Sequence, residues 1–231
     1  MGHNNRMPAP ARSTNAASRW FSQPLAVGAM AVEQAELIPQ LTAQIGVRGL
    51  YLRPAPEVPR ELSGNMLQSL TALHCAGDGW EGDLRCDGLP LPLGNESFSL
   101  IYLLHVLEQC DDPRALLREC ARCLQPEGLL LVLVFNRWSP FRWRWPAQGV
   151  RPLSSSSVER DVEGAGLSIE QRSGVGCLWR GRREQVPIPS RLHGLAKPWL
   201  SSQAIIARKR RVAPTLVGPA AARLRARVTP S

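Results

Sequence analysis

His105 is a candidate for proton transfer because of its residue type and its place in the sequence. It lies near the end of a continuous apolar run at residues 98–106, a pattern typical of a buried parallel strand. An imidazole has an ordinary pKa of about 6.5, so it can accept a proton near neutral pH. The alternative is that His105 binds backbone groups at the strand end and takes no part in chemistry.

Aromatic and basic side chains alternate in a second candidate segment. Residues 136–146 read NRWSPFRWRWP. Aromatic rings interleaved with arginines can stack on nucleic-acid bases or on a flat acceptor, and they can also enter a membrane interface. The alternative is a lid helix that packs its tryptophans onto the core. If a substrate binds residues 137–145, a planar or lipid-like acceptor is favoured.

Most of the net charge of +9 lies at the end of the sequence. Residues 208–231 contain no acid and carry seven basic side chains, which are Arg208, Lys209, Arg210, Arg211, Arg223, Arg225 and Arg227. Such a tail attracts nucleic acid or an anionic surface nonspecifically. Prolines and alanines interrupt the charges, which favours a solvated, disordered end.

The cysteines do not form a metal motif. Cys120 and Cys123 make a C-x-x-C inside a helical pattern, and no second Cys or His pair completes four zinc ligands. We therefore expect reduced thiols that pack on a helix face, and no metal. The sequence has no apolar run of transmembrane length and no signal-peptide pattern, so the expected location is the cytoplasm.

Strands and helices are expected to alternate along the chain. Residues 22–45 indicate an amphipathic helix that is kinked near Pro39, and Asp111 or Asp112 can cap a helix with Pro113 at its first position. Further helices or strands are expected at residues 47–53, 67–75, 98–106, 111–124, 129–135, 154–165, 166–173 and 202–210. This order predicts an α/β fold with a mostly parallel, doubly wound sheet covered on both faces. We expect a disordered leader at 1–18, one domain at 19–210 and a disordered basic tail at 211–231.

Two stretches match a known family. Asp87 is followed by Leu91-Pro92-Leu93 and then by Ser97-Phe98-Ser99, and residues 106–128 read VLEQCDDPRALLRECARCLQPEG. They resemble the type 11 branch of class I (Rossmann-like) S-adenosylmethionine-dependent methyltransferases. That branch has an acid and a Leu-Pro-hydrophobic triplet before Ser-Phe-Asp, and then VLEHVPDPRALLREIARVLRPGG. The resemblance implies seven strands, with the last two forming an antiparallel hairpin.

The resemblance also implies S-adenosylmethionine as cofactor, bound at the carboxyl ends of the strands where strand order reverses. Asp87, with Gly88 beside it, would accept the adenine amino group, because a carboxylate matches the N–H donors of adenine. Leu104 and His105 would face the sulfonium. The alternative for Asp87 is an Asx-turn before Gly88. Methyl transfer depends mainly on alignment of donor and acceptor, so it requires no obvious catalytic residue.

The glycine-rich turn that the family carries after its first strand is missing here. Its three glycine positions are occupied by Arg53, Ala55 and Glu57, with Pro54 and Pro56 between them. Glycine tolerates positive φ and leaves room for a ligand, whereas proline fixes φ and lacks an N–H donor. Glu57 is a candidate partner for the ribose hydroxyls or the methionine amine, in partial compensation.

Two hypotheses follow from this departure. The first is an active methyltransferase with an unconventional cofactor loop, acting on an unidentified small or lipid-like acceptor. The second is a non-catalytic relative that binds or scaffolds, in contact with nucleic acid or membrane through its tail. A small proteobacterial group resembles this sequence at Phe135-Asn136 and at residues 207–210, and it also lacks the full glycine motif.

Overall fold

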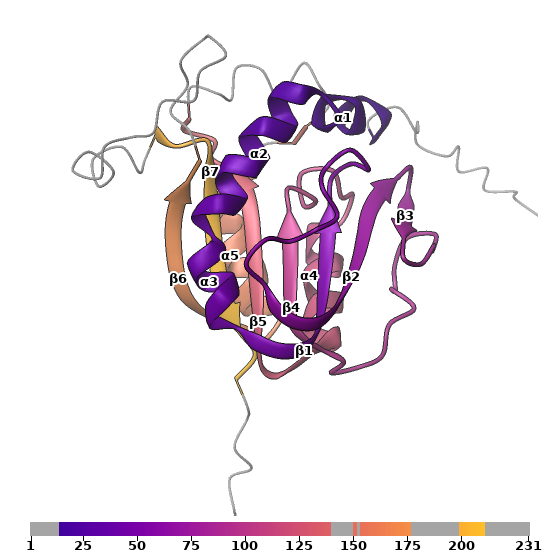
Figure 1. Ribbon diagram of the computed structural model, residues 1–231, viewed down its shortest axis with the longest axis vertical. Coiled ribbons are helices and arrows are strands. Elements are labelled where there is room, and N and C mark those ends of the chain that lie inside the picture. The colour runs from indigo at the N-terminus through magenta and orange to yellow at the C-terminus, as the bar shows by residue number, and fades with distance from the viewer. Residues whose placement is uncertain (1–13, 140–149, 152, 177–198, 211–231) are drawn as a thin grey trace, which may run out of the picture.

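The computed structural model describes residues 14–139, 150–151, 153–176 and 199–210. The helices in this part of the chain are α1 (Thr14–Phe21), α2 (Pro24–Glu36), α3 (Ile38–Ala43), α4 (Pro113–Cys123) and α5 (Ser155–Gly164). The strands are β1 (Ile45–Arg53), β2 (Met66–Ala76), β3 (Gly79–Gly82), β4 (Phe98–Leu104), β5 (Leu124–Phe135), β6 (Ser168–Val175) and β7 (Ser202–Arg208). They form one seven-stranded sheet in the order β3-β2-β1-β4-β5-β7-β6 (Figure 1).

The sheet confirms the expected fold class. Strands β2, β1, β4 and β5 are parallel, and β7 lies antiparallel between β5 and β6. The short strand β3 was not predicted. It pairs antiparallel with β2, because the chain turns back directly at residues 77–78 instead of crossing the sheet through a helix. Gly77 supports this turn with a φ of 58°, a conformation that glycine adopts at little cost.

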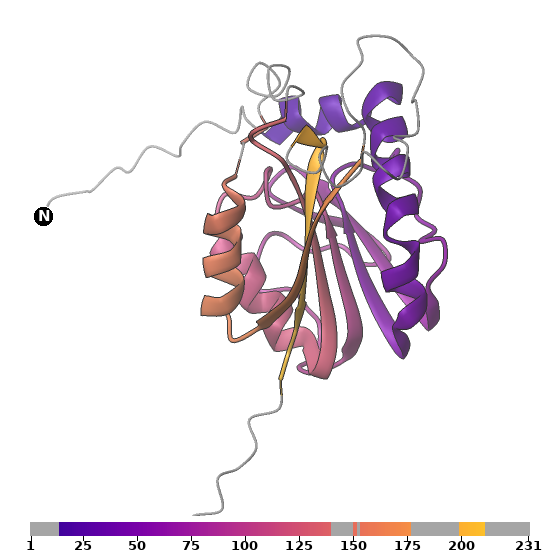
Figure 2. The same ribbon diagram turned by 90° about the vertical axis from the view of Figure 1, so that its left-hand side faces the viewer.

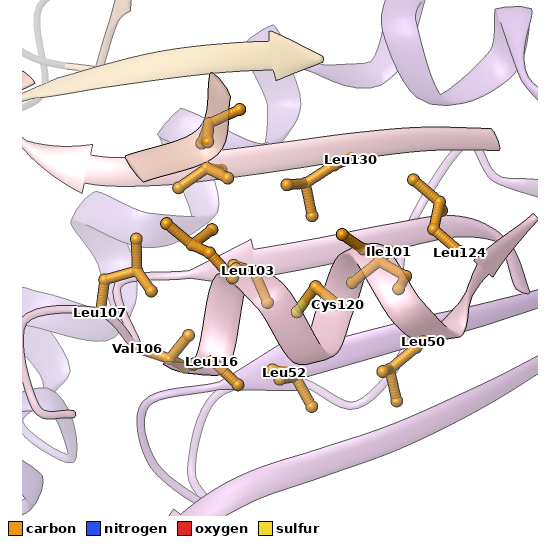
Figure 3. Close-up of a cluster of buried hydrophobic side chains, with 14 of the residues drawn as sticks. Leu50, Leu52, Ile101, Leu103, Val106, Leu107, Leu116, Cys120, Leu124 and Leu130 are labelled. Atoms are coloured by element: carbon orange, nitrogen blue, oxygen red, sulfur yellow. The ribbon is translucent and has the colours of Figure 1, made fainter. Parts of the chain in front are cut away.

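Helices cover both faces of the sheet (Figure 2). Side chains alternate across each strand, so Leu50 and Leu52 of β1 join one core cluster while Tyr51 joins the other. The first cluster lies under α4 and α5 and includes Ile101, Leu103, Leu116, Cys120 and Leu130 (Figure 3). The second lies on the side of α1, α2 and α3, where Tyr51 and Tyr102 stack with ring centroids 5.2 Å apart.

Helix α4 begins as the sequence predicts. Asp112 is its N-cap, and its Oδ1 accepts a hydrogen bond from the backbone N–H of Ala115 at 3.0 Å. Pro113 occupies the first turn. Cys120 and Cys123 are reduced and fully buried, so their predicted packing role is confirmed. Burial raises the pKa of the Cys120 thiol well above its ordinary value.

The N-terminal boundaries differ from those expected. Helix α1 begins at Thr14, inside the expected leader, because Ala17 on its inner face is buried in the core. The single helix expected at 22–45 is two helices that break at Leu37, close to Pro39. Ile45 belongs to β1 and is 78% exposed, so it is not part of a helical apolar stripe.

Some expectations concern residues outside the described part of the chain. These are the leader at 1–13, the segment 140–146, Cys177 and the basic tail at 211–231. Among the described residues, no helix has the length and apolar character needed to cross a membrane.

Candidate functional site

The strand order reverses between β1 and β4. The chain places β2 and β3 on one side of β1 and then returns to place β4 on the other side. In open α/β sheets the ligand crevice lies outside the carboxyl ends of the strands at such a point. We call the end of the sheet where β1, β2, β4 and β5 terminate the carboxyl edge. Helix α1 lies across this edge (Figure 1).

One part of the carboxyl edge contains an open cavity of about 290 Å³, which we call the Gln109 pocket. This volume is at the lower end of the range for small-molecule sites. Its walls come from the end of β2, the β2–β3 turn, the loop after β3, the loop after β4 and the first turn of α4. The lining residues are Cys75, Gly77, Asp78, Gly79, Trp80, Gly88, Leu89, Val106, Gln109, Cys110, Asp111, Asp112 and Ala115.

Gln109 lines the pocket, and one of its polar atoms has no hydrogen-bond partner. Its Nε2 donates to the backbone oxygen of Pro54 at 3.1 Å, which fixes the amide. Its Oε1 is buried and has no hydrogen-bond partner. A buried acceptor without a partner costs free energy, so a ligand N–H donor at this position would be stabilised.

The two thiols in the pocket are neutral near pH 7. Burial is the main cause that raises the pKa of both Cys75 and Cys110 above the ordinary thiol value. A thiol with a raised pKa is a weak nucleophile and a poor metal ligand. Cys75 and Cys110 therefore act as wall residues, and the pocket offers shape, an apolar surface from Trp80 and Leu89, and the Gln109 acceptor.

The loop after β1 is closed by the side chain of Arg53. This side chain is 5% exposed, and its guanidinium donates to the backbone oxygens of Pro56 and Val58. Ala55 is fully buried in the core. The carboxylate of Glu57 accepts a hydrogen bond from Ser22 at the end of α1. The loop is therefore fixed from inside by Arg53 and tied to the N-terminal helices, and it does not form a glycine-type cradle.

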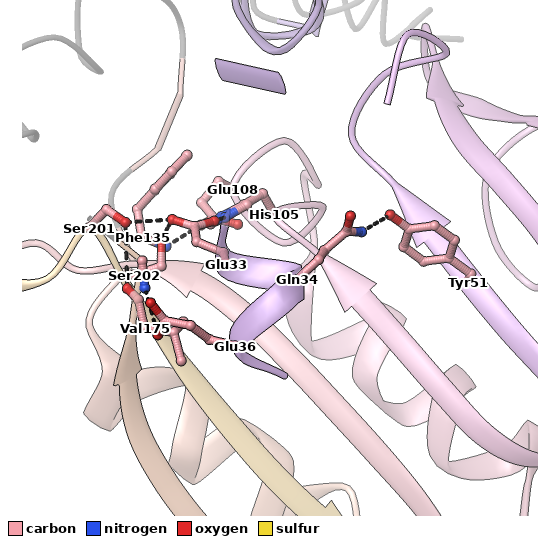
Figure 4. Close-up of polar contacts among 11 residues, drawn as sticks. Glu33, Gln34, Glu36, Tyr51, His105, Glu108, Phe135, Val175, Ser201 and Ser202 are labelled. Atoms are coloured by element: carbon pink, nitrogen blue, oxygen red, sulfur yellow. Dashed lines mark hydrogen bonds and ion pairs between the residues drawn. The ribbon is translucent and has the colours of Figure 1, made fainter. Parts of the chain in front are cut away.

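His105 lies at the centre of a second, closed part of the carboxyl edge, which we call the His105 cluster. Its Nε2 is 2.8 Å from Glu33 Oε2 of α2, and its Nδ1 is 3.2 Å from Glu108 Oε1 (Figure 4). Glu33 Oε1 also accepts from the hydroxyls of Ser201 and Ser202, at 2.5 and 2.6 Å. The imidazole, Glu33 and Glu108 are each fully buried.

Aromatic rings seal the His105 cluster. The His105 ring stacks on Phe135 with ring centroids 3.9 Å apart and on Phe21 of α1 at 6.0 Å. His105 also has a φ of 48°, in the left-handed region that a non-glycine residue seldom occupies. The backbone therefore turns sharply after β4 and aims the imidazole toward α2.

The two carboxylates decide the charge of His105. Burial alone lowers the pKa of His105, but Glu33 and Glu108 outweigh it and raise the pKa to about 9. The ring is then an imidazolium near pH 7, and it donates to both carboxylates. In this arrangement it has no lone pair with which to accept a proton. The geometry therefore favours a structural role for His105 over the general-base role considered from the sequence.

The predicted cofactor residues are dispersed around the edge. Gly88 lines the Gln109 pocket, and Asp87 next to it is exposed. Leu104 is fully buried in the core, as are His105 and Ala55. The structure therefore places Gly88 in the pocket and Asp87 beside it, while the other predicted residues do not line it.

Sequence reasoning missed Glu33, Glu108 and the pocket role of Gln109. Glu33 had a signal, because it lies in helical register with Met30 and Leu37, both of which are buried. An acid on the apolar face of a helix indicates a buried partner. Gln109 follows a run of buried residues in the sequence. Only the structure shows that its Nε2 is used by the Pro54 oxygen and that its Oε1 has no partner.

The edge fits one half of S-adenosylmethionine better than the other. The Gln109 pocket offers apolar walls and an unpaired acceptor, which suit an adenine ring with its N–H donors. The methionine half would lie toward the ends of β1 and β4. That space holds Arg53 with its own loop, the Gln109–Pro54 hydrogen bond and the sealed His105 cluster. As they stand, these residues do not fit the methionine half.

Comparisons with known proteins agree with the fold. A family model described as a methyltransferase domain matches residues 59–132. A ubiquinone biosynthesis O-methyltransferase from Parvibaculum lavamentivorans is 27% identical over 119 residues, which cover 45% of this chain and 47% of that protein. The chain therefore aligns with only about half the length of this relative.

Two solved structures share the fold over most of the chain. A methyltransferase from Thermotoga maritima, described as a possible histamine N-methyltransferase, has a TM-score of 0.54 at 17% identity and covers 87% of this chain and 98% of its own. A methyltransferase from Aquifex aeolicus has a TM-score of 0.55 at 11% identity and covers 87% and 99%. The chain therefore has the fold of these class I, Rossmann-like methyltransferases, and its residues 59–132 match the methyltransferase domain model.

Proposed function

We propose that this chain binds S-adenosylmethionine by its adenosine half in the Gln109 pocket and transfers the methyl group to a small or lipid-like acceptor. The observation that carries the proposal is an open pocket at the strand-order reversal, lined by Gln109, whose Oε1 is buried and has no hydrogen-bond partner. The family match supports the same chemistry. A relative named for ubiquinone biosynthesis supports a lipid-like acceptor. A cytoplasmic location is part of the proposal.

The residues of the chain would bind and orient the ligand. When bound, the cofactor would supply a methyl group on a sulfonium: the acceptor would attack the methyl carbon in line, the carbon–sulfur bond would break, and S-adenosylhomocysteine would leave. Gln109 Oε1 would accept an N–H of adenine, while Trp80, Leu89 and Val106 would exclude water from the ring. Asp87 is exposed beside Gly88, at the pocket wall, where its carboxylate would accept an N–H of adenine. Placing the methionine half requires the loop held by Arg53, or the helices held by Glu33, to move.

A second candidate function rests on the part of the carboxyl edge that contains the Arg53 loop and the His105 cluster. The Arg53 loop and the sealed His105 cluster favour a non-catalytic protein of this fold that binds a nucleoside and no amino-acid tail. Binding through the basic tail at 211–231 to nucleic acid or an anionic surface remains a separate proposal for that segment.

Isothermal titration separates the two candidates. The ligands are S-adenosylhomocysteine and adenosine, each titrated into the full chain and into a Gln109→Leu variant. For a methyltransferase we expect S-adenosylhomocysteine to bind at least about tenfold more tightly than adenosine, because the amino-acid tail adds contacts. Equal affinities support the nucleoside-binding alternative. Absence of heat for both ligands at near-millimolar concentration contradicts both functions.

A further inference from the structure

Two tryptophans are exposed at one end of the β5–β7 pair. Trp138 is 69% exposed and Trp199 is 56% exposed. Trp138 follows the end of β5 and Trp199 precedes the start of β7, and these strand ends are paired with each other at Phe135 and Ser202. Both indoles therefore emerge at the carboxyl edge. Packing onto the core, which was an alternative for the segment 136–146, does not describe Trp138.

Asn136 holds the two tryptophan-bearing segments together. Its Oδ1 accepts from the backbone N–H of Trp138 at 3.0 Å, and its Nδ2 donates to the backbone oxygen of Leu200, next to Trp199, at 3.0 Å. The Asn136 backbone N–H also donates to the oxygen of Ser201 at 2.9 Å. Asn136 itself is 1% exposed, so a buried residue positions both exposed rings.

A basic side chain lies over the Trp138 ring, and the flanking sequence is also basic. The guanidinium of Arg137 lies over the Trp138 ring, 5.7 Å from its centroid. In sequence, residues 137–153 carry Arg137, Arg142, Arg144 and Arg151 and no acid. Residues 177–198 carry one acid and five basic side chains, which are Arg180, Arg182, Arg183, Arg191 and Lys197.

We propose that Arg137, Trp138 and Trp199, which we call the tryptophan surface, dock the protein on an anionic lipid interface. An indole has an apolar ring and one polar N–H, and it is most stable at the level of lipid headgroups. Basic side chains beside it are attracted to anionic headgroups. Two exposed tryptophans, one with Arg137 over its ring, in segments joined by a buried asparagine, match such an interface in both apolar character and charge.

The consequence for the protein is a fixed orientation. The tryptophan surface lies on the carboxyl edge, the same edge as the Gln109 pocket. Docking would therefore bring that edge to the membrane, where lipid-like acceptors are found. The inference rests on residues that do not line the pocket, so it stands or falls separately from the proposed methyl transfer.

Vesicle flotation with the full chain tests the proposal. The vesicles are equal parts phosphatidylglycerol and phosphatidylcholine, with phosphatidylcholine alone as comparison, in 0.1 M salt. We expect binding to the anionic vesicles, and a loss of about tenfold or more in a Trp138→Ala, Trp199→Ala double variant, since each ring contributes apolar burial. Circular dichroism melting checks that the variant is folded.

An Ile45→Ala, Met66→Ala double variant is the matched control. These two exposed apolar residues pair with each other at the opposite end of the sheet, and their removal should leave flotation unchanged. A second variant, Arg137→Gln, should weaken binding to anionic vesicles and reduce its dependence on salt.

Four outcomes would overturn the proposal. The first is no flotation with either vesicle type. The second is flotation that the tryptophan double variant retains in full, which would assign binding to other basic residues such as the tail. The third is an equal loss in the Ile45 and Met66 control. The fourth is binding of a single-stranded RNA oligonucleotide that the tryptophan variant loses while vesicle binding is absent, since stacked bases would then be the partner.

Discussion

The Gln109 pocket and the His105 cluster are neighbours on one edge of the sheet, yet they differ in how many partners their buried polar groups have. In the cluster, both ring nitrogens of His105 lie next to Glu33 and Glu108 and two serine hydroxyls donate to Glu33, while Glu108 Oε2 is buried without a partner. In the pocket, the Oε1 of Gln109 is left unpaired beside a cavity. A satisfied polar network stabilises a fold, whereas an unsatisfied group beside a cavity indicates a place for a ligand.

Glu33→Ala should have the largest effect, because it removes the carboxylate that closes the cluster. The change leaves a buried imidazolium with one partner, the Ser202 hydroxyl without its acceptor and the Ser201 hydroxyl with only the Val175 oxygen at 3.5 Å. We therefore expect a loss of about 3–5 kcal/mol in the free energy of unfolding. Urea denaturation followed by circular dichroism measures it. Glu163→Ala, an exposed glutamate on α5, is the control and should change stability by less than about 0.5 kcal/mol. Equal effects in the two variants would contradict the account of the cluster.

The cluster should also make stability depend on pH. The folded pKa of His105 is raised to about 9, above the ordinary value of about 6.5 expected in the unfolded chain. Its contribution is therefore fully present below about pH 6.5 and is lost as the pH rises through 9, by up to about 1.4 kcal/mol per pH unit.

The check compares urea denaturation of the wild-type protein and His105→Asn between pH 6 and 9.5. Asparagine tolerates the positive φ of this position and does not titrate, so the variant should show a flatter pH profile. Parallel profiles would mean that other groups cause the pH dependence and that His105 is not the charged centre of the cluster.

Gln109→Leu tests whether the Gln109 pocket binds a ligand. The variant keeps the side-chain size but removes the acceptor, so we expect adenosine and S-adenosylhomocysteine to bind about tenfold more weakly. Titration calorimetry measures the affinities. Gln171→Leu, on the exposed face of β6, is the matched control and should bind as the wild type does. If Gln109→Leu binds equally well, the unpaired oxygen does not contact the ligand.

Arg53→Ala should have the smallest effect. It tests whether the loop held by Arg53 limits binding of the methionine half of the cofactor. Without its guanidinium, the oxygens of Pro56 and Val58 lose their donor, and the loop after β1 can move. We expect the affinity for S-adenosylhomocysteine to rise about threefold relative to adenosine, because the tail gains room. Faster amide exchange at residues 55–58 is the structural readout. An unchanged ratio of affinities would show that Arg53 does not limit the methionine half.

Much of the fold follows from local patterns. The apolar run that predicts a strand at 129–135 lies within β5, and Asp112 with Pro113 predicts the start of α4. These features depend on residues close in sequence, where propensity and capping decide the structure. The hairpin from β2 to β3 was not predictable, because its strand of only four residues gives no periodicity to detect.

The edge of the sheet that holds the candidate site could be predicted from the sequence, but the contacts between its side chains could not. Gly88 and Asp87 were predicted as cofactor residues because their spacing to Leu91-Pro92 resembles that of the family, and the structure places Gly88 on the pocket wall. The His105 cluster depends on Glu33, which is 72 residues away from His105 along the chain. No local pattern relates such residues, and only the tertiary structure shows that the helix before β1 supplies the partner of the histidine after β4.

The shortness of β3 has a consequence for how the protein behaves at high concentration. Its four residues form the outermost strand on that side of the sheet, and Trp80 already exchanges two backbone hydrogen bonds with Cys86 of the following loop. A strand with exposed backbone groups is a template on which another molecule can add its own strand, and longer templates do so more readily. Because β3 has only four residues, this edge of the sheet offers few backbone groups for another molecule to pair with, which disfavours fibril-type self-association here.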